Sequence, residues 1–191
     1  MSPNVTNAWF PLRAGTVLRY EGTDEDVPVK DVLSVTSKTR AVAGGRARVV
    51  HDRVFKHGRV VEDTLDYYAQ DGAGNVWYFG EATKELNARG RVITREGSWE
   101  DGENGARAGI FMPAHPHVGR SYRQEYYKGH AEDHFKIESI RGKRLVTHEW
   151  TPIEPGVLDQ KVYVQGIGTT SEDSLKGGAE HLHLVGSTQA G

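Results

Sequence analysis

The sequence predicts an all-β protein, a single antiparallel meander of about ten strands curled into a barrel or half-barrel, with very little helix. Glycine supplies 23 of the 191 residues, above its usual share of about 7%. These glycines separate short segments rich in Val, Tyr, Thr and Phe. No segment of about 12 residues or more repeats apolar side chains with the period of a helix. We therefore expect less than about 15% helix and at least about nine strands.

Each expected strand is bounded by residues that tolerate a positive φ angle, as tight turns require. In the first half of the chain, strands are expected at residues 16–21, 29–37, 47–55, 60–70, 76–80 and 92–96. In the second half, they are expected at residues 121–127, 133–140, 144–150, 157–164 and 179–185. Residues 100–119 hold four glycines and two prolines and are expected to form one long loop. Because loops of this length are often functional, we expect a lid here on a single domain spanning residues 1–191.

Composition and charge exclude several classes of protein. The 24 Lys and Arg residues are balanced by 26 Asp and Glu residues, so the chain lacks the basic field that attracts nucleic acid. It has no cysteine, which excludes disulfide scaffolds, thiolate metal sites and cysteine nucleophiles. No apolar run reaches the roughly 18 to 20 residues of a membrane span. We expect a soluble protein of open oligomeric state, cytoplasmic as the sequence stands and exported if a signal peptide has been removed.

Acidic residues interrupt strand faces that are otherwise apolar. Because side chains alternate along a strand, Glu81 is expected on one face with Trp77 and Phe79. Burial is expected for Tyr67, Trp77, Phe79 and Trp150, because aromatic packing dominates the energetics of a core. A carboxylate on such a face must be hydrogen-bonded, paired or protonated, since burying an unpaired charge is costly.

Two interpretations of these acidic residues stay open. In the first they belong to a polar pocket inside the barrel, whose ligand-binding residues are expected to be Tyr67, Trp77, Glu81, Trp99, His115 and Tyr127. In the second they pair with Arg53, Arg95 and Arg123 as structural braces, or β-bulges turn them outward. The first interpretation predicts binding of one small, largely apolar molecule without turnover, because barrels of this strand number have room for one ligand.

The alternative on the same scaffold is an acid–base enzyme such as an isomerase, cyclase or lyase. Its expected catalytic residues are Glu125 and Asp133, one with a pKa raised by desolvation, acting with His148 or a tyrosine hydroxyl. A raised carboxyl pKa in a cleft favours this enzyme. A carboxylate paired with arginine, whose pKa is lowered, favours the binding protein.

A second alternative is a metal protein that uses the nine histidines. The run His130, Glu132 and His134 places two imidazoles and a carboxylate on one strand face, a ligand set that suits Zn²⁺ or non-haem Fe(II). His181 and His183 also share a face, and two prolines flanking His115 restrict its backbone. The leading interpretation requires no cofactor, and a divalent metal is the one cofactor left open. No Walker loop, G-x-G-x-x-G or H-E-x-x-H motif occurs.

Seven blocks of sequence, at residues 9–20, 66–71, 75–81, 96–100, 122–127, 163–168 and 181–185, share one resemblance. Through them most of the chain resembles a broad group of uncharacterised bacterial proteins. The resemblance implies a curled antiparallel sheet similar to the half-barrels of lipoprotein carriers, often in exported or lipid-anchored proteins, and no established activity. The chain departs from the group in lacking a lipobox cysteine, and in having His130 and His134 where a carboxylate and an apolar residue are expected.

Overall fold

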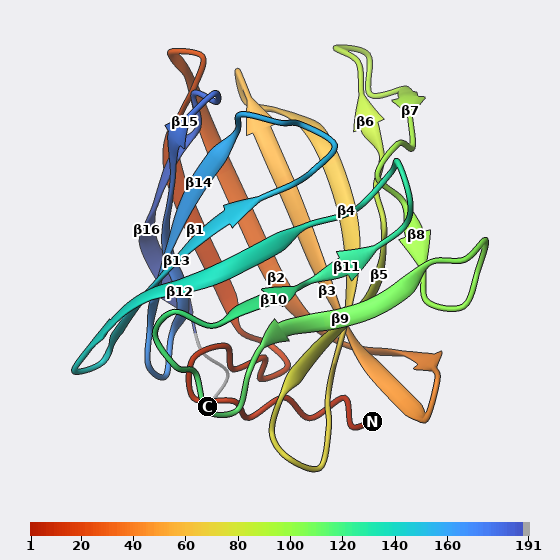
Figure 1. Ribbon diagram of the computed structural model, residues 1–191. Coiled ribbons are helices and arrows are strands. Elements are labelled where there is room, and N and C mark those ends of the chain that lie inside the picture. Colours follow the sequence, from red (N-terminus) through yellow and green to blue (C-terminus); the bar gives the residue numbers. More distant parts are fainter. Residues whose placement is uncertain (189–191) are drawn as a thin grey trace.

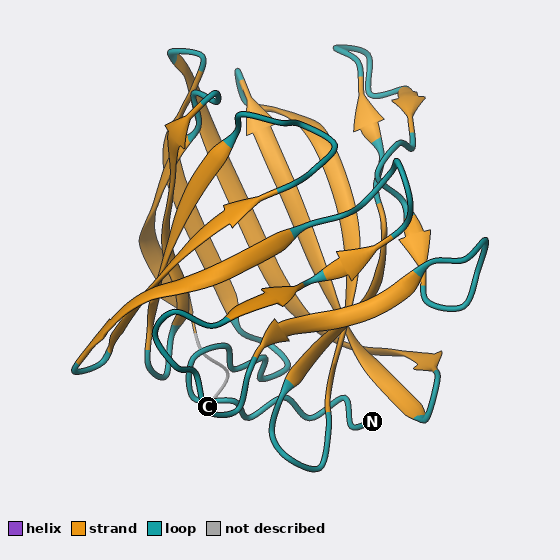
Figure 2. Cartoon of the chain, viewed as in Figure 1, coloured by secondary structure: helices purple, strands orange, loops and turns teal. Residues whose placement is uncertain are grey.

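The computed structural model describes residues 1–188, and every regular element in this range is a β-strand (Figures 1 and 2). The first eight strands are β1 (Val17–Asp24), β2 (Val27–Val42), β3 (Gly45–Lys56), β4 (Arg59–Gln70), β5 (Val76–Ala82), β6 (Glu85–Leu86), β7 (Val92–Thr94) and β8 (Trp99–Glu100). The other eight are β9 (Arg107–Met112), β10 (Ser121–Arg123), β11 (Glu125–Tyr126), β12 (His134–Arg141), β13 (Arg144–Trp150), β14 (Leu158–Val164), β15 (Gly168–Lys176) and β16 (His181–Thr188). The predicted all-β antiparallel class is therefore confirmed, with more strands than expected.

One continuous antiparallel sheet curls until it is nearly a closed barrel. Its strand order is β10-β12-β13-β14-β15-β16-β1-β2-β3-β4-β5-β9-β11. The two ends of this order are adjacent in the chain, because only Gln124 separates β10 from β11. β10 pairs with β12 and β11 pairs with β9, so one short segment joins both edges of the sheet. Gly109 permits this close approach, since a Cβ atom there would lie 2.2 Å from the carbonyl oxygen of Arg123.

The N-terminal segment closes one end of the barrel (Figure 1). Trp9 and Phe10 of this segment are 5% exposed and belong to the main core cluster. Asn7 fixes the segment in place: its side-chain amide donates to the carbonyl oxygens of Gly74 at 3.0 Å and Pro113 at 3.1 Å. Its side-chain oxygen accepts from the backbone N–H groups of Trp9 and Phe10. Ligand access through this end is therefore blocked by packed side chains.

A bulge between β4 and β5 decides which of their side chains face the interior. Asp66 is opposite Glu81 and Tyr68 is opposite Tyr78, so β5 has one more residue than β4 between these two pairs. The bulge lies at Gly80, whose φ of 138° favours glycine. The inserted residue reverses the alternation along β5. Glu81 and Tyr78 consequently both face the interior.

The expected grouping of Glu81 with Trp77 and Phe79 is therefore wrong, because the alternation rule assumes an unbroken register. Tyr67 and Phe79 are buried as predicted, but in a second cluster separate from the main core. Trp77 is only partly buried against that cluster. Trp150 is also only half-buried, because it stacks on His134 with ring centroids 5.7 Å apart instead of entering the core.

Four strands form in segments where none was expected: the two-residue strands β6 and β8, and the longer β9 and β15. β9 occupies the middle of residues 100–119, pairing with β5 and β11, so this part of the expected loop belongs to the wall and not to a lid. β15 is composed mainly of Gly, Thr, Ser, Glu and Asp. It lacks the usual alternation of apolar and polar residues because the barrel interior that it faces is itself polar. Within residues 1–188, no helix has the length and apolar character needed to cross a membrane.

Candidate functional site: an acidic cavity inside the barrel

The barrel encloses a cavity of about 210 Å³ that leads into a second hollow of about 340 Å³. Both are lined by Glu81, Glu125, Asp133, Lys161 and Glu172. The outer hollow reaches the β11–β12 and β13–β14 loops, which lie at the end of the barrel opposite the N-terminal segment (Figure 1). The structure thus provides one path from the inner cavity to the open end.

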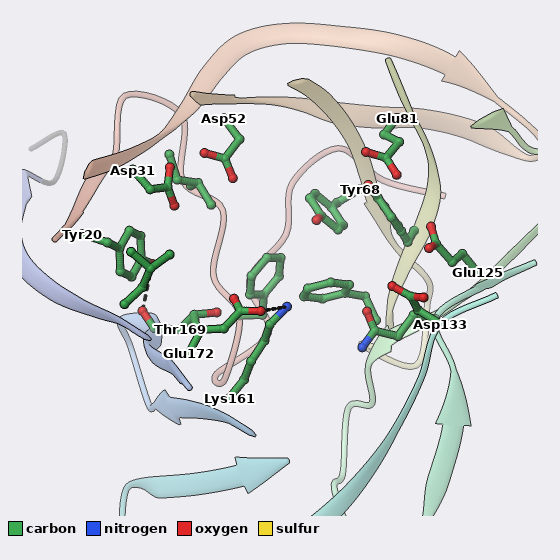
Figure 3. Close-up of a pocket in the computed structure, with 16 residues that line it drawn as sticks. Tyr20, Asp31, Asp52, Tyr68, Glu81, Glu125, Asp133, Lys161, Thr169 and Glu172 are labelled. Carbon is green, nitrogen blue, oxygen red and sulfur yellow. Dashed lines mark hydrogen bonds and ion pairs between the residues drawn. The ribbon is translucent and has the colours of Figure 1, made fainter. Parts of the chain in front are cut away.

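The lining of the inner cavity is dominated by carboxyl groups. Its acidic residues come from different parts of the wall: Asp31 (β2), Asp52 (β3), Glu81 (β5), Glu125 (β11), Asp133 (before β12) and Glu172 (β15). Lys161 of β14 is the single basic residue among the described residues that line it. The aromatic part of the lining consists of Phe10, Tyr20, Tyr68, Tyr78 and Phe111. Six carboxyl groups therefore share an aromatic-walled cavity with one ammonium group (Figure 3).

Lys161 is held between two carboxylates. Its Nζ atom lies 3.2 Å from Oε1 of Glu172 and 3.3 Å from Oε2 of Glu149. Burial alone would lower the pKa of Lys161, but the charges of Glu149 and Glu172 outweigh it and raise the pKa well above the usual value. Burial raises the pKa of Glu172 to about 7, against the opposing effect of Lys161. The one cation of the cavity is thus already engaged.

A second group of acids, Glu81, Glu125 and Asp133, forms no ion pair with a cation among residues 1–188, although the charge of Lys161 opposes the burial-induced rise in the pKa of Asp133. Burial raises the pKa of Glu125 well above its ordinary value, and the carboxyl groups of Asp133 and Glu81 raise it further. The indole N–H of Trp99 donates to Oε2 of Glu125 at 2.6 Å, which opposes the shift. Burial likewise raises the pKa of Asp133 and brings that of Glu81 to about 7. These groups therefore hold protons at a pH where ordinary carboxyls are ionised.

A third group consists of Asp31 and Asp52 beside Tyr20. Burial, together with a hydrogen bond and a charge interaction with Asp52, raises the pKa of Asp31 to about 10. The Oδ1 atoms of both aspartates are buried without a hydrogen-bond partner among the described residues. The Tyr20 hydroxyl does not serve them, because it donates to the carbonyl oxygen of Thr169 at 2.9 Å. Buried oxygens in this state are unusual and call for a partner.

Of the residues expected from the sequence, the structure brings Glu81, Glu125 and Asp133 together in the cavity, with Trp99 behind Glu125. His148 is not with them. It lies on the outer side of β13 with Nδ1 3.6 Å from Oε1 of Glu138.

Of the expected aromatic walls, Tyr67, Trp99 and Tyr127 line a different hollow of about 300 Å³, together with Glu81. Tyr67 is in the second cluster, with the Arg40 guanidinium 4.7 Å above its ring. The indole N–H of Trp77 donates to Asp71 outside the cavity at 2.8 Å. His115 is exposed in the segment after β9, and Tyr127 stacks on His130 near the open end.

The three residues expected to bind metal are not oriented toward one point. His130 stacks on Tyr127, Oε1 of Glu132 accepts from the backbone N–H of Gly129, and His134 pairs through Nδ1 with the carbonyl oxygen of Glu132. Among residues 1–188, no three His, Asp or Glu side chains are grouped closely enough to hold a metal ion.

The cavity residues that sequence reasoning missed include Tyr20, Asp31, Asp52, Lys161 and Glu172. Four of these five lie within or at the edge of predicted strands, so the available signal was a charged or polar residue in a strand. The sequence did not predict which face of its strand each of these residues would occupy. The comparisons add no further assignment: no family model, no curated protein and no solved structure matches this chain.

Proposed function

We propose that this barrel binds a small organic cation, such as a primary amine, in its interior cavity. The observation that supports this best is the imbalance of charge in the lining, where six carboxyl groups face one lysine that is already paired. Like charges held together away from water repel one another strongly, and an ammonium group between them would relieve that repulsion. The ligand would supply the positive charge that the cavity lacks.

The raised carboxyl pKa values also come from crowding buried carboxyl groups together with too few cations. A cavity built to hold a neutral ligand has no need of Glu81, Glu125 and Asp133 without cations, and the arginine braces expected on the sequence are not among its lining residues. A cationic ligand would displace the protons that these carboxyls retain when the cavity is empty. The charged lining therefore favours an amine over the largely apolar molecule expected from the strand faces.

The remaining lining suits the carbon skeleton of such a ligand. Aromatic faces attract cations and also pack against aliphatic chains. The inner cavity, at about 210 Å³, is below the roughly 300–1,000 Å³ of pockets that hold drug-sized molecules. The ligand is accordingly expected to be a small metabolite and not a lipid.

The test compares pentylamine with pentanol, which has the same carbon chain and no positive charge. Isothermal titration calorimetry at about pH 8 should give at least about tenfold tighter binding of pentylamine. Glu125→Gln should reduce that preference, and Glu138→Gln on the outer face should leave it unchanged. Equal binding of the two compounds, or binding of neither, would contradict the proposal.

A second candidate function is acid–base catalysis by Glu125 and Asp133. The favouring observation is that two neighbouring buried carboxyls with raised pKa values provide a proton donor and, once one ionises, a base. His148 takes no part, since it lies outside. Incubation of the protein with a small-molecule extract, followed by mass spectrometry, separates the two functions. Consumption of a compound by the wild type and not by Glu125→Gln supports the enzyme; retention of an unchanged compound supports the binding protein.

A further inference from the structure

The acids of the cavity form two separate anionic groups. Figure 3 shows Asp31 and Asp52 with Tyr20 on one side, and Glu81, Glu125 and Asp133 on the other. The first group projects from β2 and β3, and the second from β5, β11 and the start of β12. The two groups lie on opposite sides of the cavity, near enough for the charge of Asp52 to raise the pKa of Glu81.

The one cation among the described lining residues lies between the two groups and is already ion-paired. Lys161 and Glu172 lie between them in Figure 3, joined by the 3.2 Å ion pair. Glu149 binds the same lysine and also accepts a hydrogen bond from the amide of Gln124 at 3.0 Å. A ligand therefore meets a closed ion cluster at the middle of the cavity and unmatched carboxyl groups at both ends.

The first end has its own evidence for a missing partner. Oδ1 of Asp31 and Oδ1 of Asp52 are each buried without a hydrogen-bond partner in the described part of the chain. A buried acceptor left unpaired costs about 1–3 kcal/mol, and more when it is charged. An ammonium group has three donors and no acceptor, so it can serve both oxygens at once.

We infer that the cavity binds a dication, an aliphatic diamine whose two ammonium groups bind Asp31 and Asp52 at one end and Glu81, Glu125 and Asp133 at the other. This inference rests on the proposed function and specifies its ligand. The methylene chain of the diamine passes the apolar part of the lining, to which Phe10, Leu33 and Phe111 contribute. A monoamine satisfies one end only and leaves the other group of carboxyls unmatched.

The experiment measures binding of cadaverine, pentylamine and pentanol, which share a five-carbon chain and carry two, one and no positive charges. Wild-type protein should bind cadaverine at least about tenfold more tightly than pentylamine. In the double variant Asp31→Asn/Asp52→Asn, cadaverine should bind no more tightly than pentylamine. Pentylamine should keep its wild-type affinity in this variant, because it binds the opposite end. Retained pentylamine binding also shows that the variant is folded.

The outcomes separate this inference from the proposed function. Equal affinities of cadaverine and pentylamine for the wild type would contradict the inference that the ligand is a dication, and would still support amine binding. No binding of either amine overturns both. If the double variant does not fold, diamines of four to eight carbons are titrated into the wild type instead. A sharp optimum of affinity at one chain length supports two fixed ends, and affinity independent of length overturns them.

Discussion

The two faces of the β4–β5 wall have opposite compositions. The inner face presents Asp66 and Glu81 with Tyr68 and Tyr78, and the Tyr78 hydroxyl donates to Oδ1 of Asp66 at 2.6 Å. The outer face presents the apolar cluster of Ala47, Val49, Tyr67, Ala69 and Phe79. In most antiparallel barrels the apolar face would be expected inside and the polar face outside. Here part of the stabilising packing has moved outward, and the interior is left free for charged groups.

The largest effect is expected from the outer face. Phe79→Ala removes a side chain that is 3% exposed and should cost about 3–5 kcal/mol in the free energy of unfolding. Ile93, which is 61% exposed on β7, provides the control, since Ile93→Ala should change stability by less than about 0.5 kcal/mol. Urea denaturation of both variants measures the difference. Similar losses would mean that the outer cluster does not stabilise the wall.

A somewhat smaller loss of stability is expected at the β-bulge at Gly80, which turns Glu81 toward the inner face. A Cβ atom at Gly80 would lie 2.3 Å from the carbonyl oxygen of Trp99, and the φ of 138° is unfavourable for alanine. Gly80→Ala should therefore cost about 3 kcal/mol. Gly72→Ala is the matched control, because no atom lies within 4 Å of a Cβ there. Thermal melts measure the difference. Equal melting temperatures for the two variants would contradict the role of Gly80 in setting the register.

The inner face should give the protein an unusual pH dependence. The pKa of Glu81 and that of Glu172 rise from 4.5 to about 7 on folding, so the folded state holds protons that the unfolded state releases. Their contribution to stability is complete below about pH 4.5 and is lost as the pH rises through about 7. The loss should be on the order of 3 kcal/mol for a single carboxyl, from the size of its shift. Denaturation curves between pH 4.5 and 8 measure it, and stability that increases across this range would contradict the assignment.

The last effect is a gain in stability. Glu81→Gln keeps the shape of the side chain and removes a charge that lies near Glu62, Asp133 and Asp52. At about pH 8 the variant should be more stable than the wild type by up to about 3 kcal/mol, the loss that ionisation of Glu81 causes, and near pH 4.5 the two should be equal. Glu21→Gln, which removes an exposed partner of Lys30, should show no such gain. A destabilised Glu81→Gln at pH 8 would indicate that the ionised carboxylate is favourable inside the barrel.

The sequence identified several residues of the interior but did not predict how they are arranged. Glu81, Glu125 and Asp133 were found because a carboxylate within an apolar, aromatic strand is conspicuous, and all three line the cavity. Tyr67 and Trp77 were placed in the pocket by the same argument and lie outside it. The bulge at Gly80 explains why Trp77 and Glu81 lie on different faces of β5, since one inserted residue reverses every later side chain. Tyr67, by contrast, lies on the face of β4 opposite to Asp66 and Tyr68.

The sequence alone determined the all-β class, because turn-forming glycines and the absence of a helical period are local properties that survive any tertiary arrangement. The tertiary structure alone decided where the charges meet. Lys161 and Glu172 are opposite each other on the paired strands β14 and β15, but Asp31 of β2 shares a cavity with them only because the sheet curls round on itself. Their shared cavity depends on strand register and closure, which are set by hydrogen bonds between strands and leave no local pattern in the sequence.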